Sequence, residues 1–377
     1  MNKVYISDSS IYVSDGNYSS KYPRANELLQ NGIPFISPAN FNGNSIDDSN
    51  MKYISPEKHA ELKKGHIKTD DVLITVRGNN GISVMVPKQY NDANINAQLA
   101  FIRTDNSKLL AKFIYYYFKS DNAKAKIKES ETGTALKQFP INKLLKFGIP
   151  AYSKEKQIRI ISVLDTLNQS ILIKQNELKS LNELIKSQFI EMFGDPKTNS
   201  LDLDTDTPVN LCESISAGGD RPKEVSDIKT DEYCYPIYSN GEKDDGLYGW
   251  SKEYRIEKPS VTVSGRGTIG YTSYRKEGKF TPIVRLIVLT PNERINPVYL
   301  TYFMNMEREE GLGSGVQQLT VPMIKQKKII VPEIELQNKF ASFVEQIDKS
   351  KFIVQKQIDD LQELLDSKMQ EYFGEEE

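Results

Sequence analysis

Two long segments of the chain repeat one pattern of apolar and polar positions at a constant offset of about 180 residues. In residues 153–193 and 333–373 the apolar positions coincide from Ile160 and Phe340 onward, and they recur three and four residues apart. Neither segment contains proline or an internal glycine. This spacing is typical of a long amphipathic helix, so the pattern predicts one such helix in each half of the chain.

A single helix of this length would expose its apolar positions to water. With a rise of about 1.5 Å per residue, some 38 residues span roughly 55 Å. We therefore expect the two copies to pack against each other as an antiparallel pair, and two unrelated helical hairpins are the alternative. The positions expected to pack are Leu164, Leu167, Leu178, Leu181, Ile185, Val344, Ile347, Ile358, Leu361 and Leu365.

The residues that precede each long helix repeat as well, with looser spacing. Residues 71–78 parallel 260–267, and both are β-branched runs that end in Arg-Gly, as expected for strands followed by turns. The aromatic runs 113–118 and 299–303 are predicted to form short helices on those strands. The fold class is therefore mixed α/β, with two α/β domains, a pair of long helices and a pseudo-two-fold internal repeat.

The pattern also sets domain boundaries. The predicted segments are a first domain at 1–152, a long helix at 153–195, a linker at 196–208, a second domain at 209–332 and a second long helix at 333–377. The second half opens with an extra segment before the loop at Gly219, whereas the first half reaches the equivalent Gly16 almost at once. The start of the first domain, and its packing against the last helix, are therefore left open.

Charge is distributed unevenly although the net charge is only −2. Residues 1–152 carry 20 Lys and Arg against 14 Asp and Glu, whereas residues 333–377 carry 5 against 12. A basic surface in the first domain would suit a polyanion such as nucleic acid.

Two cysteines cannot form a disulfide framework, and no apolar run resembles a membrane span or a signal peptide. We therefore expect a cytoplasmic protein without membrane contact.

Several signals for enzyme chemistry are weak. Residues 265–270 have the spacing G-x-G-x-x-G, but a dinucleotide site needs a helix next, and residues 271–275 resemble another strand. Asn296 is expected to cap a helix that begins at Pro297. His59 and His66 are expected in an exposed lysine-rich loop without metal ligands around them, and paired aspartates such as 244–245 are expected in turns.

Four short motifs recur in the same order in both halves. They are an Arg-Gly turn (77–78, 266–267), a Gly-to-Gln segment (133–138, 313–318), an Ile-Pro or Val-Pro step before a Gln-containing helix start (Gln157, Gln337) and a Phe-Gly end (193–194, 373–374). This order resembles the specificity subunit of type I restriction–modification enzymes over nearly the whole chain.

The resemblance implies a non-catalytic DNA-recognition subunit. Each domain would be a target recognition domain that reads one half of a split, asymmetric site in double-stranded DNA. The paired helices would set the spacing and dock two methyltransferase subunits, and a restriction and translocase subunit would join the assembly. On this reading the chain itself binds no cofactor and no metal, and S-adenosylmethionine, ATP and magnesium belong to the partner subunits.

The expected DNA contacts lie in loops and are polar, basic or aromatic, because base edges and phosphates are bound by such side chains. The candidates are Asn17, Tyr18, Lys21, Arg24, Asn40, Asn42, Arg77, Asn79, Asn80, Gln98, Arg221, Lys223, Asn240, Arg266, Tyr271 and Arg285. Arg77 and Arg266 stand out because they occupy equivalent places in the two halves.

Two other classes of function stay open at this point. One is a self-sufficient DNA methyltransferase or nuclease with a degenerate site. The other is a helical scaffold or silent specificity variant that organises partners without reading a sequence. A methyltransferase would bind S-adenosylmethionine as a purified chain, and a scaffold would show no enriched DNA motif.

Overall fold

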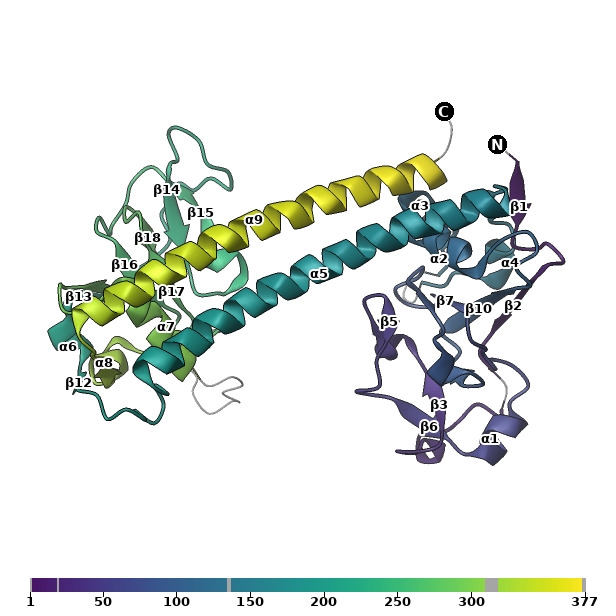
Figure 1. The fold of residues 1–377 in the computed structure, drawn as a ribbon, viewed down its shortest axis with the longest axis horizontal. Helices are drawn as coiled ribbons and strands as arrows, with labels where there is room; N and C mark the ends of the chain where they lie inside the picture. Colours follow the sequence, from purple (N-terminus) through teal and green to yellow (C-terminus); the bar gives the residue numbers. More distant parts are fainter. Residues whose placement is uncertain (1, 19, 134–136, 309–317, 375–377) are drawn as a thin grey trace. The chain divides into compact units, whose positions relative to one another are not determined.

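The computed structural model describes residues 2–18, 20–133, 137–308 and 318–374, which divide into two compact units. Unit 1 comprises Met1–Ile173 and Gln357–Glu377, and unit 2 comprises Lys174–Lys356. Both long helices are therefore shared between the units. Figure 1 labels the elements, and each unit is described separately.

The main sheet of unit 1 has four antiparallel strands in the order β2 (Ile11–Asp15), β10 (Leu99–Thr104), β7 (Val72–Thr75) and β8 (Ser83–Met85). Alternate residues of β7 point to opposite faces, and both faces are covered. Val72 and Ile74 belong to the core that contains α2 (Ala111–Lys119), whereas Leu73 belongs to a second core. Burial on both faces explains why this strand is a continuous apolar run.

A second, three-stranded sheet supports the first. β3 (Ile33–Ile36) pairs antiparallel with β6 (Lys52–Ile54) and parallel with β9 (Asn94–Ile95). The remaining elements of this domain are β1 (Lys3–Tyr5), η1 (Ala25–Glu27), η2 (Pro38–Asn40), β4 (Phe41–Asn42), β5 (Ser45–Ile46), α1 (Pro56–Glu61), η3 (Lys88–Tyr90), α3 (Asp121–Ser130), α4 (Ile141–Leu144) and β11 (Gly148–Pro150).

Unit 2 repeats this architecture. Its four-stranded sheet has the order β13 (Cys212–Ala217), β19 (Ile287–Pro291), β16 (Ser260–Val263) and β17 (Thr272–Arg275). Its three-stranded sheet has β14 (Tyr235–Tyr238) between β15 (Leu247–Ser251) and β18 (Thr281–Pro282). The other elements are β12 (Thr205–Asp206), α6 (Pro208–Leu211), η4 (Lys243–Gly246), α7 (Pro297–Glu307), α8 (Val321–Lys325) and β20 (Ile329–Ile330). The predicted mixed α/β class and its internal repeat are confirmed.

Each long helix is continuous over 40 residues, as α5 (Lys154–Phe193) and α9 (Ile334–Phe373). In unit 1 the start of α5 packs with the end of α9, since Ile160 and Phe373 share one core. In unit 2 the end of α5 packs with the start of α9, since Phe189 and Phe340 share another. The two helices therefore run antiparallel (Figure 1). None of the helices in the described part of the chain is both long and apolar enough to cross a membrane.

The positions expected to pack between the helices differ in burial. Leu164, Leu167, Ile185, Val344 and Ile358 are buried. Leu178, Leu181, Ile347, Leu361 and Leu365 are half-buried. Three further pairs that follow the same register are exposed, namely Leu172 and Phe352, Ile173 and Ile353, and Leu184 and Leu364.

A buried glutamine fixes the start of each long helix. Gln157 is fully buried, and its side chain accepts from the amide of Leu110 (2.9 Å) and donates to the carbonyls of Lys108 and Tyr152. Gln337 is also fully buried and bonds in the same way to the amide of Asn296 (2.8 Å) and to the carbonyls of Arg294 and Pro332. Each glutamine thereby ties its long helix to the loop before the aromatic helix, which gives the repeated glutamine a structural role.

The start of the first domain, which the sequence left open, is formed by the short strand β1, which pairs antiparallel with β11 just as β12 pairs with β20. The segment 196–208 is not a plain linker, because β12 lies within it and belongs to the second domain. Residues 134–136 of the first Gly-to-Gln segment and residues 313–317 of the second lie outside the described residues.

Candidate nucleic-acid interface

Three loops of unit 1 meet at one edge of the four-stranded sheet. The end of β2 lies beside the start of β10, where Asp15 pairs with Ala100, and the start of β10 lies beside the end of β7. Because neighbouring antiparallel strands alternate in direction, the residues after β2, before β10 and after β7 converge. This edge therefore collects Asn17 and Tyr18, Gln98, and Arg77.

Arg77 stacks on Tyr18 at this edge. The guanidinium carbon lies 4.2 Å from the centre of the Tyr18 ring, a distance suited to a cation–π contact. Burial and a hydrogen bond to Asp15 raise the pKa of Tyr18 to about 12, so its hydroxyl is neutral at physiological pH. Lys64 reaches the same carboxylate, with 3.1 Å between Nζ and Oδ1. Arg77 is half-exposed as a residue, so its guanidinium can still donate to a ligand.

The turn between β7 and β8 extends this edge. Gly78 has a φ of 86°, a conformation that suits glycine, and the exposed Asn79 follows it. Asn80 donates to the carboxylate of Glu131 over 2.9 Å. Gln98 accepts from the side chain of Asn96 and its carbonyl accepts from the amide of Val76, so its position is fixed.

A cavity of about 510 Å³ next to this turn is lined by lysines that the sequence pattern did not single out. They are Lys119, Lys124, Lys128 and Lys137. Burial lowers the pKa of Lys119 to about 8. Lys124 and Lys128 are one turn apart on α3, so their i, i+4 spacing was the available signal. These side chains are suited to phosphate contacts.

The remaining candidates of the first domain lie elsewhere. Asn40 is buried, and its amide oxygen accepts from the backbone and the hydroxyl of Ser37, so it stabilises η2 rather than facing a ligand. Asn42 donates to Asp47. Lys21 pairs with Glu61 at 3.5 Å, and Arg24 precedes η1, where its amide is capped by Glu27.

Unit 2 builds the corresponding edge around Arg266. This arginine follows β16, is exposed, precedes Gly267 with a φ of 66° and donates to Gln318 (3.2 Å). Arg285 precedes β19, is exposed and has a φ of 59°, a conformation that costs free energy for a side chain with a Cβ. Arg77 and Arg266 thus occupy equivalent turns in the two units.

Asn240 holds the loops of this second edge together. Its amide oxygen accepts from the backbone of Gly265 and its nitrogen donates to the carbonyl of Val284, each over 2.7 Å. Both hydrogen-bonding groups of the side chain are therefore used within the protein. Asn240 therefore positions the turns of Arg266 and Arg285.

The other candidates of unit 2 have aromatic or acidic neighbours. Arg221 donates to the hydroxyl of Tyr248 (3.0 Å), and Lys223 is exposed. Tyr271 donates to Asp245 (2.8 Å), which also forms a 2.6 Å ion pair with the buried Arg275. Asp245 lies in η4 with a φ of 55°, and it anchors the side chain of Tyr271.

The structure also shows where the residues behind the earlier signals for other chemistry lie. Residues 271–275 contain β17, so the G-x-G-x-x-G segment is part of a β-hairpin and no helix follows it. Asn296 caps α7 by accepting from the amides of Val298 and Tyr299, as predicted.

The expectation that His59 and His66 lie in an exposed loop without a carboxylate nearby is wrong. His59 lies in α1, and His59 and His66 are half-buried beside the carboxylate of Asp92.

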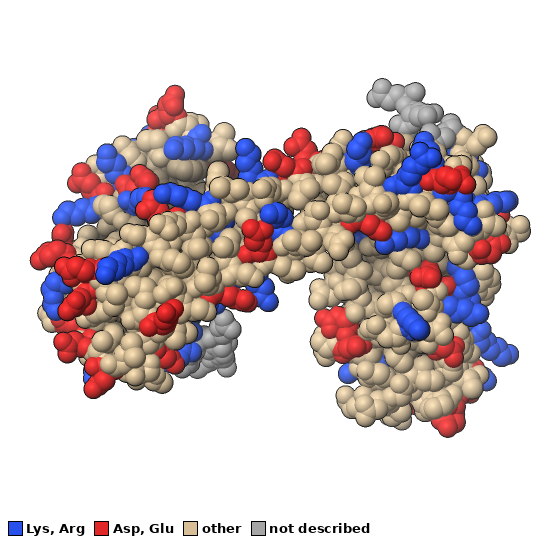
Figure 2. Space-filling model, in the orientation of Figure 1, with Lys and Arg blue, Asp and Glu red and all other residues tan. Residues whose placement is uncertain are grey.

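Figure 2 shows acidic and basic side chains interspersed over both units on the face drawn, with large areas that carry neither. A broad basic surface does not dominate this face. The positive groups suited to DNA are instead individual loop residues at the two sheet edges and the lysines of α3.

Two equivalent α/β domains, each with a polar loop edge and each containing parts of both long helices, define a duplicated α/β protein. Residues 17–183 and 210–363 match the family model described as Type I restriction modification DNA specificity domain, so the chain belongs to that family.

The chain is similar to two Mycoplasma pneumoniae proteins that are named as type I specificity subunits. One is 35% identical over 133 residues, which cover 35% of this chain and 36% of that protein. The other is 34% identical over 135 residues, which cover 36% of this chain and 40% of that protein. The aligned part is thus well under half of each relative's length.

Two solved structures share the fold. The crystal structure of the S subunit of a type I restriction–modification system from M. genitalium has a TM-score of 0.61 at 17% identity, covering 100% of this chain and 96% of that one. A chain from work on complex assembly and conformational transition of the type I R-M system has a TM-score of 0.55 at 17% identity, covering 82% and 83%. At this identity the likeness extends to the fold alone.

Proposed function

We propose that this chain is the DNA sequence-recognition subunit of a type I restriction–modification complex. The observation that carries the proposal is the equivalent placement of Arg77 and Arg266 at matching sheet edges of two duplicated domains. Arginine is well suited to guanine and to phosphate oxygens because its fork of N–H donors is fixed. Each domain would read one half of a split site in double-stranded DNA.

The two edges differ in the residues around each arginine. Arg77 has Tyr18 and Gln98 at its edge, whereas Arg266 has Gln318 and Arg285. Different side chains present different hydrogen-bonding patterns to base edges, so the two half-sites would differ in sequence. The target would therefore be bipartite and asymmetric.

The long helices would dock the partner subunits. Leu172 and Ile173 on α5, and Phe352 and Ile353 on α9, are exposed apolar side chains at equivalent positions of the repeat. In unit 2 the residues around Phe352 line a groove of about 1,060 Å³ together with Thr301 of α7. A duplicated apolar site supports the binding of two copies of one partner, which we assign to methyltransferase subunits, with restriction subunits in the same assembly.

Catalysis would then belong to the partners and not to this chain. S-adenosylmethionine would bind to the methyltransferase subunits, and ATP and magnesium to the restriction and translocase subunits. The complex would act in the cytoplasm, where the chromosomal DNA is.

The proposal is tested by mapping methylated adenines in a methylation-free host that carries the methyltransferase gene, with and without the gene for this chain. We expect one new bipartite motif only when both genes are present. Unchanged methylation would contradict recognition, and footprinting without an enriched motif would instead indicate a scaffold. Methyl transfer or cleavage by the purified chain alone would indicate a self-sufficient enzyme.

A further inference from the structure

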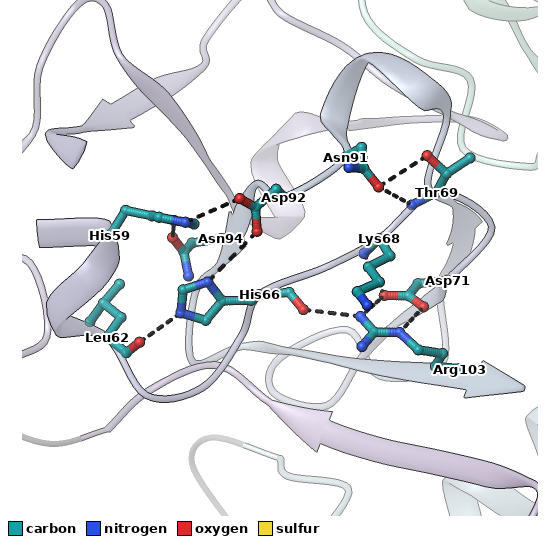
Figure 3. A network of polar contacts seen from close by, with 10 residues as sticks. All are labelled: His59, Leu62, His66, Lys68, Thr69, Asp71, Asn91, Asp92, Asn94 and Arg103. Atoms are coloured by element: carbon teal, nitrogen blue, oxygen red, sulfur yellow. Dashed lines mark hydrogen bonds and ion pairs between the residues drawn. The ribbon is translucent and has the colours of Figure 1, made fainter. Parts of the chain in front are cut away.

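Unit 1 gathers two histidines and an aspartate from separate parts of the sequence. His59 is on α1, His66 follows it, and Asp92 lies just before β9 (Figure 3). One nitrogen of each imidazole and one carboxylate oxygen of Asp92 lie within 4.8 Å of one another. His59 Nε2 is 3.5 Å from Asp92 Oδ2, and His66 Nδ1 is 4.0 Å from Asp92 Oδ1.

In each imidazole, the nitrogen that does not face Asp92 forms a hydrogen bond with an acceptor oxygen. His66 Nε2 lies 2.6 Å from the carbonyl oxygen of Leu62, which can only accept, so Nε2 carries the hydrogen. His59 Nδ1 lies 2.5 Å from the amide oxygen of the fully buried Asn94, so Nδ1 carries the hydrogen there. In the neutral rings, His59 Nε2 and His66 Nδ1 therefore present lone pairs.

Both lone pairs face the carboxylate oxygens of Asp92, which also carry lone pairs and a negative charge. Three such groups pointing at one place repel each other unless a proton or a metal cation lies between them. The nearby guanidinium of Arg103 does not supply that charge, because it is paired with the buried Asp71 at 2.6 Å (Figure 3). Metal-binding histidines typically have this arrangement, in which the second nitrogen donates to a fixed acceptor.

The backbone fixes the three side chains with respect to one another. His66 and Asn94 form an antiparallel bridge, and the amide of Asp92 donates to the carbonyl of Ile67 over 2.8 Å. The carbonyl of His66 also accepts from Arg103 (3.1 Å). A site held in place in this way loses little conformational entropy when it binds an ion.

We propose that His59, His66 and Asp92 form a binding site for a divalent transition metal, with Zn²⁺ as the best match. Two imidazoles and one carboxylate suit zinc, whereas calcium and magnesium prefer oxygen ligands. Ligand atoms around tetrahedral zinc lie about 3.3 Å apart, so closing the site needs a shift of about 1 Å, mainly by the exposed Asp92. A solvent molecule would occupy the fourth position, on the exposed side.

The bound metal would act on the segment between α1 and β7. That segment contains Lys64, whose ammonium pairs with Asp15 at the sheet edge described above. A metal that joins His59 and His66 to Asp92 would hold this segment in place. The inference is independent of the proposed function, because metal binding is measured without DNA.

The test uses the 377-residue chain without a histidine tag, stripped with EDTA and titrated with Zn²⁺ by calorimetry and with Co²⁺ by visible absorption. The chain contains only 2 histidines, so any imidazole ligation must come from these residues. We expect one ion per chain, tetrahedral Co²⁺ absorption and a higher melting temperature with Zn²⁺. His59→Gln and His66→Gln should each weaken binding at least about tenfold.

Asp92→Asn has a matched control in Asp70→Asn. Both aspartates are exposed and have left-handed backbones, with φ of 67° and 69°, which asparagine tolerates. We expect D92N to weaken zinc binding at least about tenfold and D70N to leave it unchanged. If circular dichroism shows that a histidine variant does not fold, the comparison of D92N with D70N still tests the metal site.

Three outcomes would overturn the site. The first is no saturable binding by the wild-type chain, which would leave two histidines whose imidazoles are hydrogen-bonded to Asn94 and Leu62. The second is binding that persists in the double histidine variant, which would place the ion on other groups such as the cysteines. The third is an equal loss in D92N and D70N.

Discussion

Arg77 and Arg266 have the same backbone setting but different partners. Both follow a buried strand and precede a glycine with positive φ, so the position is set by the turn. Arg77 lies on the Tyr18 ring, whereas Arg266 donates to Gln318. The stacked arginine has less freedom and can hold one orientation toward a base edge.

Replacing these arginines should affect one half-site each. In the assembled complex, Arg77→Ala and Arg266→Ala should each weaken binding by about 1–3 kcal/mol and relax specificity in a different half of the motif. Competition with DNA sites mutated in either half measures this. Arg159→Ala, an exposed position on α5, is the control. A uniform loss across all sequences would indicate phosphate contacts and would contradict base reading.

Lys119 offers a probe of the lysine-lined cavity. Because burial disfavours the ammonium and lowers its pKa to about 8, roughly half of the side chain is neutral at that pH. Acetylation at pH 8 followed by mass spectrometry should label Lys119 faster than the exposed Lys143, and the labelling rate of Lys119 should fall as the pH is lowered and its amine is protonated. Bound DNA should slow the labelling of Lys119. Equal rates at all pH values would contradict the shift.

At the level of the elements, the buried glutamines show how a short motif serves the fold. Gln337 bonds to three backbone groups from two loops, and no apolar side chain can replace those bonds. Gln337→Met should lower the free energy of unfolding by roughly 2–4 kcal/mol, because it leaves buried polar groups without partners. Thermal denaturation measures this, with the exposed Gln326→Met as control. An unchanged melting temperature in Gln337→Met would contradict the anchoring role.

The elements with strong periodicity could be predicted from the sequence. The register of α5 and α9 follows from apolar spacing, and the strand β7 follows from a run of β-branched residues between polar turns. The two arginine turns could be matched because each has a glycine at a fixed offset. These features are local, so a single sequence contains the information.

Sites formed by residues that are far apart in the sequence could not be predicted. His59 and Asp92 are brought together by the bridge between His66 and Asn94, a pairing that no local pattern indicates. Asn40 and Asn240 were expected as polar loop residues that face a ligand, but both amides form hydrogen bonds within the protein. Whether a polar side chain faces a ligand or the protein depends on tertiary contacts.

At the level of the whole molecule, each unit is completed by residues from both halves of the sequence. Phe373, at the end of α9, is buried against Phe113 at 5.1 Å between ring centres in unit 1. Phe193, at the end of α5, is buried against Tyr299 at 4.8 Å in unit 2. The repeated Phe-Gly ends are therefore parts of the two cores.

Removing the Phe373 ring should destabilise unit 1, although the residue is far from that unit's sheet in sequence. Phe373→Ala should cost about 3–5 kcal/mol, as expected for a buried aromatic ring. Phe352→Ala is the control, because this ring is 74% exposed, and its loss should change stability by no more than about 0.5 kcal/mol. Calorimetry resolves the transitions, and similar shifts in both variants would contradict the assignment.

The burial of Phe373 in the first core also bears on synthesis. On a ribosome that releases the chain from its N-terminus, residues 1–173 emerge long before the partner residues near position 373 are translated. During that interval the aromatic face of α2 around Phe113 lacks its cover, and it would be a binding site for chaperones. A premature stop codon ahead of Phe373 should therefore expose the nascent first half to proteolysis as well as deleting the end of α9.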